Sequence, residues 1–440
     1  MTFSCGIDFG TTNTIAALTQ NGQTPHLIAL EKDEVSIPSA LFFDTDKKIY
    51  YGRHAMKMYI NGKCGRCMRS LKSVLGSDLM ATGTYMYGQR VSFTDIIGYF
   101  LQNVKNKIDT TAGHNVENVV LGRPVHFRDH DVNGDMRAEN ELRMIATNIG
   151  FKNIEFQYEP IAAAFAHERF IENEKLACVI DIGGGTSDFT ILRISKQFMS
   201  KNDRKDDILA STGVRIGGNN FDKDFSLKCF MPSFGYGSLQ GGKTKYDKII
   251  NLPTIPFHNM AEWSTINTMY NYKDLSFAKK MLFNSIEKEK VSRFVELIEK
   301  EQGYSLLNTV ENSKIKLTDA TDIATTLDFI SDRPKIFASR QEFEDSLKFD
   351  LKRIFEKIDE CVNLAQIKKN NIQLVLLTGG STEIPLIQHM VSDYFPNAEL
   401  SQENKFSSVG IGLAYDSIRK FAPNNNLILN IDMIKNNKLR

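Results

Sequence analysis

Two short segments of the sequence carry residue types that can bind phosphate groups and a metal ion. The first contains Asp8, Gly10, Thr11, Thr12 and Asn13, and the second contains Asp181, Gly183, Gly184, Gly185, Thr186 and Asp188. Glycines let backbone N–H groups approach a phosphate closely, and threonine hydroxyls add donors. An aspartate beside the same phosphates is favourable only if a cation such as Mg²⁺, with its water shell, lies between the charges. Together the two segments predict a site for a metal–nucleotide complex.

Both segments are predicted to be the tips of β-hairpins. Each follows an apolar run that ends at its aspartate and precedes a second apolar run, at residues 15–18 and 189–192. A single Asp-x-Gly turn is weak evidence for phosphate binding, because this pattern usually closes an ordinary hairpin. Its recurrence at matched positions in the two halves of the chain indicates a duplication, in which two facing tips could clamp a polyphosphate.

The rest of the chain favours two related α/β lobes. Strand-and-turn segments at residues 119–124 and 374–380 are each followed by a helical stretch, one in each half of the chain. The length of 440 residues also suggests about three folding units or two large lobes with insertions, because domains average roughly 150 residues. A single small core is therefore excluded.

Charge and hydropathy exclude several classes of protein. Lysine and arginine number 54 and aspartate and glutamate 53, so the formal net charge is +1 and no large field attracts polyanions. We therefore expect no nucleic-acid binding and no membrane binding, and no apolar run approaches the roughly 18 residues of a membrane span. The first residues lack a basic segment followed by a long apolar stretch, which predicts a cytoplasmic location.

Six cysteines are scattered through the chain, which is typical of a reduced protein and not of a disulfide scaffold. Cys64 and Cys67 have the spacing of a zinc or redox motif. No second pair follows at the spacing of a zinc finger, so we interpret this pair as a coincidence.

The two glycine-rich segments and three further motifs resemble the ATPase domain of the DnaK-type heat-shock chaperones, within the superfamily that includes actin and the sugar kinases. The further motifs begin at Glu159, Gly217 and Gly379, and the resemblance runs nearly end to end. It implies an α/β protein with the two-lobed actin-like ATPase fold, in which duplicated ribonuclease-H-like lobes enclose a nucleotide cleft. It also implies ATP or ADP with Mg²⁺ as the bound cofactor.

The resemblance assigns roles to particular residues. Lys72 matches the family's catalytic lysine, whose ammonium would stabilise charge on the transferred phosphoryl group. Glu159 matches the carboxylate that orients the attacking water. Asp8 and Asp181 match the residues that would hold Mg²⁺ through its water shell, and Thr186 completes the catalytic set. The implied nucleotide-binding residues are Gly10, Thr11, Thr12, Asn13, Gly183, Gly184, Gly185, Thr186, Asp188, Gly217, Gly218, Glu311, Lys314, Thr318, Gly379, Gly380 and Ser381.

The resemblance also divides the chain into regions. Residues 1–172 are predicted to form lobe I, and residues 173–405 are predicted to form lobe II, which carries an enlarged insert at about 223–310. Residues 406–422 are predicted to form a crossing helix that returns to lobe I, and residues 423–440 a short tail.

The base pocket departs from the family pattern. Glu311 and Lys314 keep the family's ribose contacts. Ile315 and Glu383, however, stand where the family has two arginines that stack against adenine. Phe406 stands near the position of a usual aspartate. We therefore expect weaker binding and weaker discrimination of the base.

The ATPase pattern ends near residue 421, and we expect no peptide-binding domain after it, as in the truncated YegD-like branch of the family. The resemblance then implies slow ATP hydrolysis coupled to closure of the lobes. Two alternatives stay open: a small-molecule kinase of the sugar-kinase type, which needs an acceptor pocket with a carboxylate base, and a non-catalytic scaffold that binds nucleotide. A protein partner could bind the 223–310 insert or the tail.

Overall fold

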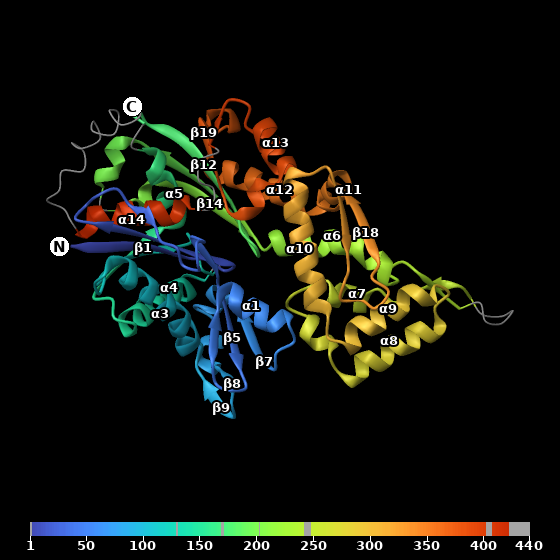
Figure 1. The fold of residues 1–440 in the computed structure, drawn as a ribbon. Coiled ribbons are helices and arrows are strands. Elements are labelled where there is room, and N and C mark those ends of the chain that lie inside the picture. The colour runs from blue at the N-terminus through green and yellow to red at the C-terminus, as the bar shows by residue number, and fades with distance from the viewer. Residues whose placement is uncertain are drawn as a thin grey trace, which may run out of the picture.

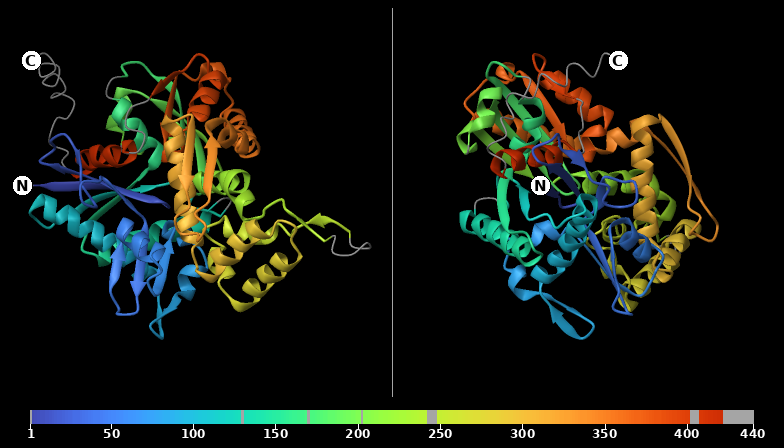
Figure 2. Two further views of the ribbon diagram at one scale, coloured as in Figure 1. Left: turned by 45° about the vertical axis from the view of Figure 1, so that its right-hand side comes forward. Right: turned by 60° about the vertical axis from the view of Figure 1, so that its left-hand side comes forward.

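The fold contains two mixed β-sheets with helices packed between and around them (Figures 1 and 2). The computed structural model describes residues 2–128, 131–168, 171–201, 203–241, 248–401 and 407–421. Phe406 and the predicted tail at residues 423–440 lie outside these ranges.

The first sheet is built around the hairpin of β1 and β2. Strand β1 pairs antiparallel with β2 in a register that places Asp8 opposite Ile15, and it pairs parallel with β10, which in turn pairs parallel with β11. Strands β3 and β4 both add to β2. The strands are β1 (Phe3–Phe9), β2 (Asn13–Gln20), β3 (His26–Leu27), β4 (Ser36–Pro38), β10 (Asn118–Arg123) and β11 (Asn153–Tyr158).

The second sheet repeats this connectivity. Strand β12 pairs antiparallel with β13, with Asp181 opposite Asp188, and parallel with β19, which pairs parallel with β20; β14 extends the sheet beyond β13. The strands are β12 (Lys175–Ile182), β13 (Ser187–Ile194), β14 (Ile208–Val214), β19 (Leu374–Thr378) and β20 (Glu399–Ser401). Because each sheet has a hairpin flanked by two parallel strands in the same order, the predicted α/β actin-like fold is confirmed.

Two helices lie between the sheets, α5 (Glu159–Glu168) and α14 (Ser408–Phe421). Helix α14 packs on α5 and on β1, β2 and β10. The two helices cross closely enough that a Cβ at Gly412 would lie 1.8 Å from the carbonyl oxygen of Ala162. The small residues of α5 and glycine in α14 therefore determine how closely this central layer packs.

Helices also cover the outer side of the first sheet. Helix α3 (Phe93–Ala112) begins at Ser92, whose hydroxyl accepts a hydrogen bond from the N–H of Asp95, and ends at Gly113 in the left-handed conformation. Beside α3 lies α4 (Val132–Asn148). An outer extension of this half consists of α1 (Gly52–Ile60) and a three-stranded sheet of β5 (Ala40–Asp44), β6 (Ile49–Tyr51) and β7 (Gly65–Arg69). The same half also contains α2 (Leu79–Thr82) and the hairpin of β8 (Thr84–Met86) and β9 (Gln89–Val91).

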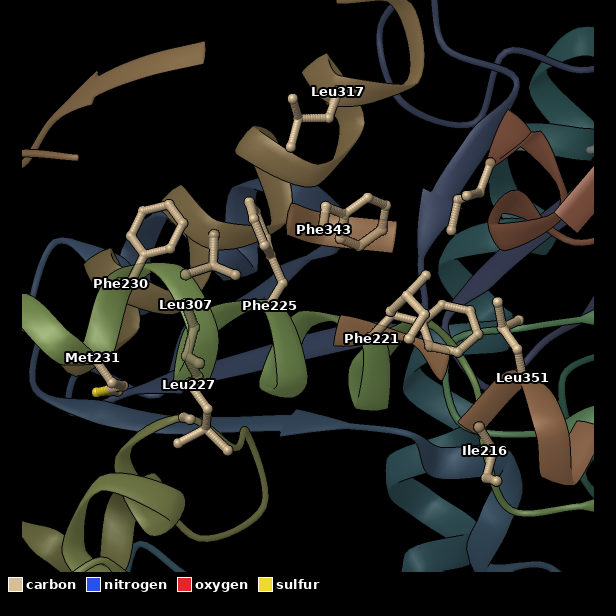
Figure 3. Close-up of a cluster of buried hydrophobic side chains, with 14 of the residues drawn as sticks. Ile216, Phe221, Phe225, Leu227, Phe230, Met231, Leu307, Leu317, Phe343 and Leu351 are labelled. Carbon is tan, nitrogen blue, oxygen red and sulfur yellow. The ribbon is translucent and has the colours of Figure 1, made fainter. Parts of the chain in front are cut away.

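The second half has a larger outer region. The helices of this region pack around one apolar core (Figure 3). In this core, Phe225 of α6 contacts Phe343 of α11 at a ring-centroid distance of 5.1 Å, and α10 contributes Leu307 and Leu317. The elements are α6 (Gly218–Phe225), β15 (Leu239–Gln240), β16 (Ile250–Asn251), α7 (Ile255–Met260), α8 (Tyr272–Asn284), α9 (Lys288–Glu299), α10 (Gly303–Asp319), β17 (Asp322–Thr326), β18 (Lys335–Ser339), α11 (Arg340–Ser346), α12 (Lys348–Leu364) and α13 (Pro385–Tyr394).

All six cysteines are free thiols, which confirms the prediction that they form no disulfides. None of the described helices is both long and apolar enough to cross a membrane.

Candidate functional site

The tips of the two hairpins lie against each other. The turn between β1 and β2 places the hydroxyl oxygen of Thr12 only 2.1 Å from the position that a Cβ of Gly184 would occupy. A side chain at Gly184 would therefore separate the tips. The glycine therefore lets the two turns approach each other closely, as two loops must do if they are to hold one chain of phosphates.

The turn between β12 and β13 is also the meeting point of two other segments of the second half. Gly218 donates a backbone hydrogen bond of 2.9 Å to the carbonyl of Gly183, and Ser381 Oγ lies 3.4 Å from the same oxygen. Gly217 packs so closely that a Cβ on this residue would lie 2.6 Å from the carbonyl oxygen of Gly183. Gly379 has a φ of +81°, a conformation that favours glycine. Together with Gly380 at the start of the following turn, these residues form one cluster around the second glycine-rich segment.

Helix α10 brings the predicted ribose residues to the edge of this cluster. Lys314 Nζ lies 2.8 Å from Asp222 Oδ1 and 3.6 Å from the position of a Cβ at Gly218. Glu311 precedes Lys314 by three residues and Thr318 follows it by four, so all three lie on one face of the helix. Burial raises the pKa of Asp222 to about 6, although the ammonium of Lys314 opposes the rise.

A lysine and several carboxylates from both halves of the chain form a charged cluster near the ends of β1 and β12. Lys72 Nζ lies 2.5 Å from Glu159 Oε1, and both side chains are largely buried. Burial and the charge of Glu159 raise the pKa of Asp8 to about 7, and the same two causes raise the pKa of Asp181 to about 6. Glu159 and Asp181, from the two halves of the chain, line the same cavity.

The charge balance of this cluster favours a bound cation. Burial and the charges of Asp181 and Glu159 also raise the pKa of Asp188 to about 7, and Thr186 Oγ1 donates a hydrogen bond of 3.2 Å to its carboxylate. Burial alone would lower the pKa of Lys72, but the surrounding carboxylates hold it above the usual lysine value. The carboxyl groups outnumber this single ammonium. A divalent ion with its water shell would stabilise all of them in the ionised form.

Lys72 is held in place by residues that the sequence did not single out. The turn that carries it begins at Ser70, whose φ of 56° and ψ of 34° are left-handed. Arg128 donates to the carbonyls of Ser73 (2.8 Å) and Leu75 (3.1 Å), and Glu141 accepts a hydrogen bond of 2.7 Å from the N–H of Gly76. These contacts join segments more than 50 residues apart, so no local pattern in the sequence could have identified them.

A cavity of about 450 Å³ opens beside the charged cluster, between the two sheets. Glu159, Asp181 and Asp188 line it on one side, and Arg128 and Lys357 also contribute to its wall. The cleft therefore leaves space next to the carboxylates for water or for a small molecule.

Two of the positions that depart from the family pattern lie on α10 and on the short turn after Gly379. Ile315 follows Lys314 on α10, and this residue is 56% exposed. Glu383 ends the short 3₁₀ turn that begins at Gly380. Phe406, the third such position, lies outside the described residues.

Comparisons with known proteins agree with this architecture. A family model described as MreB/Mbl protein matches residues 2–226, and one described as Hsp70 protein matches residues 279–418. The chain is 25% identical over 402 residues to the chaperone protein DnaK of Elusimicrobium minutum, covering 88% of this chain and 53% of that protein. It is 24% identical over 425 residues to DnaK of Thermotoga petrophila, covering 94% and 58%. For the chaperone protein HscA homolog of Aliivibrio salmonicida, the identity is 24% over 429 residues, covering 93% and 57%.

The chain spans a little more than half the length of these curated relatives. The MreB/Mbl match covers 225 of the 440 residues, and the Hsp70 match covers much of the remaining half. Both matches fit the duplicated sheets and the facing glycine-rich hairpins. The chain therefore belongs to the Hsp70/actin-like ATPase family.

Proposed function

We propose that this protein binds ATP with Mg²⁺ in the cleft between its two sheets and hydrolyses it slowly, as a chaperone-family ATPase. The observation that carries the proposal is the ion pair of Lys72 and Glu159, placed beside Asp8 and Asp181 where the two glycine-rich tips meet. A lysine and a carboxylate at this point can act on the terminal phosphate and on water, respectively.

Each of these residues has a distinct role in the proposed reaction. The backbone amides of the two tips would bind the phosphates, and Glu311 and Lys314 would bind the ribose. Lys72 would stabilise the negative charge that develops on the terminal phosphoryl group. Glu159 would orient the attacking water, which can approach through the adjoining cavity.

The excess of carboxyl groups supports the metal as part of the complex. Asp8 at the end of β1 and Asp181 at the end of β12 would hold the water shell of Mg²⁺ from opposite sheets. When bound, the ion supplies positive charge that neutralises the phosphate oxygens. Because its partners come from both halves of the chain, the complete site would form only when the lobes close on the nucleotide.

A second candidate function is the transfer of the terminal phosphate to a small alcohol. The cavity beside Glu159 and Asp181 supports it, because a kinase needs space for an acceptor next to a carboxylate base. The direct ion pair of Glu159 with Lys72 favours hydrolysis, since a carboxylate held in this way is placed to orient water near the phosphate.

The enlarged region at 223–310 supports a further role in binding a protein partner. Helix α8 in this region leaves 86% of Tyr272 and 69% of Phe283 exposed. Large exposed apolar side chains that gather on one element are typical of protein-binding surfaces.

Replacing Asp8 or Asp181 with asparagine should weaken Mg²⁺-dependent ATP binding by about tenfold or more, because such outer-shell carboxylates contribute this much to metal affinity. Titration calorimetry with ATP, with and without Mg²⁺, measures the effect. Asp46→Asn, at an exposed position, is the matched control. Equal Mg²⁺ dependence in the wild type and in both cleft variants would contradict the two-sided metal site.

Replacing Ile315 with arginine should tighten ATP binding by about fivefold and raise the preference for ATP over GTP, since a guanidinium stacked on adenine is worth about 1 kcal/mol. The exposed position offers space for the longer side chain. Competition titrations of ATP against GTP measure both quantities, with Leu79→Arg, also at a position that is 56% exposed, as the control. An unchanged ATP-to-GTP ratio would show that position 315 does not face the base.

A further inference from the structure

The two halves of the chain touch at a second place, on the outer side of the cleft. Tyr59 and Ile60, at the end of α1 in the first half, pack against the apolar core of the second half. The ring of Tyr59 lies 3.9 Å from the ring of Tyr304, measured between centroids. Tyr304 is 95% buried and stands in the first turn of α10. An aromatic contact therefore bridges α1 and α10.

A charged side chain reinforces this bridge. The guanidinium carbon of Arg69, at the end of β7, lies 4.4 Å from the ring centroid of Trp263, and this ring lies 5.5 Å from that of Tyr304. Arg69 Nη1 is buried and makes no hydrogen bond within the described part of the chain. The aromatic face is therefore a main partner of this cation, and a cation–π contact gains strength as it loses water.

The two segments that form this contact also carry residues of the candidate nucleotide site. Arg69 precedes Lys72 by three residues, across the left-handed turn at Ser70. On the opposite side, Tyr304 and Lys314 belong to the same helix. Arg69 is also near enough to Asp222, the partner of Lys314, to exert an electrostatic effect on it. A separation of the lobes that frees the nucleotide must break the ring contacts or displace these two segments.

We propose that Arg69 and Trp263, supported by Tyr59 and Tyr304, form an interlobe clasp that holds the cleft closed and sets the rate at which nucleotide leaves. This inference rests on the proposed nucleotide-binding function and adds a contact that controls the rate of nucleotide release. Arg69 and Trp263 act as positioning residues, because they influence the nucleotide through the lobes that they join. Neither is required for the chemical step.

The rate of nucleotide release tests the clasp. In a stopped-flow experiment, a fluorescent ADP analogue bound with Mg²⁺ should leave the Arg69→Ala variant about tenfold or more faster than the wild type, the effect of losing a partly desolvated cation–π contact. The single-turnover rate of hydrolysis should change by less than about threefold, because Lys72 and Glu159 remain. Arg66→Ala is the control, since Arg66 lies on the same strand and donates to the carbonyl of Tyr85 instead.

The single tryptophan of the chain provides an independent measurement. In the absence of nucleotide, Arg69→Ala should shift the emission of Trp263 to longer wavelength, because the ring gains contact with water, and Arg66→Ala should not. Arg69→Lys keeps a cation over the ring and should release ADP at an intermediate rate. Circular dichroism and thermal melting establish that each variant is folded.

The outcomes separate the clasp from the function on which it rests. A shifted emission with an unchanged release rate would overturn the clasp and leave the nucleotide site intact. An unshifted emission would show that Arg69 does not cover Trp263 in solution, which also overturns the clasp. Failure of the wild type to bind ADP or ATP would overturn the proposed function, and with it the role in release, while the emission would still report the contact between the lobes.

Discussion

Replacing Lys72 with alanine should lower the rate of ATP hydrolysis by about 10²-fold or more while nucleotide affinity changes little, because its ammonium acts mainly on charge that develops in the transition state. In the structure this ammonium is paired with Glu159 at 2.5 Å and lies among carboxyl groups from both lobes. Its removal would leave Glu159, the proposed water-orienting carboxylate, without its partner, and the phosphoryl group without the proposed cation.

Single-turnover hydrolysis and equilibrium binding should be measured on the same Lys72→Ala protein. Lys57→Ala, an exposed lysine on α1, is the matched control and should retain the wild-type rate. A loss of affinity with an unchanged rate constant for hydrolysis would mean that Lys72 binds the ground state and is not catalytic.

Replacing Arg204 with alanine should lower the free energy of unfolding by about 3–5 kcal/mol, the usual cost of removing one partner from a buried ion pair. The Arg204 guanidinium is fully buried. Its Nη1 and Nη2 donate to Glu168 at 2.9 and 2.6 Å, and its Nε donates to Asp207. The variant leaves the buried carboxylate of Glu168 without its cation, whereas Asp207 keeps the ammonium of Lys201 at 2.5 Å. Because Glu168 ends α5, this network fastens the central helix to the segment between β13 and β14.

Urea unfolding followed by circular dichroism measures the effect of Arg204→Ala. Lys205→Ala, at the adjacent exposed position, is the control and should change the free energy of unfolding by less than about 0.5 kcal/mol. A loss below about 1 kcal/mol in the Arg204 variant would show that the buried carboxylates are relieved by protonation or by water.

The duplicated fold could be predicted because its signal is local. A strand that ends in aspartate, a glycine-rich turn and a returning strand occupy a dozen consecutive residues, and the same order appears at Asp8 and at Asp181. Two copies of one local pattern sufficed to indicate two related sheets. The strands that flank each hairpin also carried recognisable apolar runs.

The roles within the site were accessible only through the resemblance. Nothing about an isolated lysine at position 72 distinguishes it from a solvated surface lysine. Its pairing with Glu159 joins residues 87 positions apart and depends on the whole first sheet. The roles assigned to the site residues, and the boundaries between lobes at 172 and 405, remain predictions.

The contacts between distant segments could not be predicted at all. Arg69 and Trp263 are separated by nearly 200 residues, and neither belongs to a motif of the family. The same is true of Arg128, which holds the turn carrying Lys72. Such contacts result from the packing of complete elements, so they require the three-dimensional structure.

The fate of the terminal phosphate of ATP tests the central claim most directly. The purified protein should be incubated with Mg²⁺ and ATP labelled at the γ-phosphate, with and without a panel of sugars and other small alcohols, and the products separated. Slow release of free phosphate that does not depend on an added alcohol is the predicted result. A labelled phosphoester would instead establish a kinase, and unchanged ATP bound to the protein would establish a non-catalytic scaffold; either product pattern would contradict the proposed ATPase.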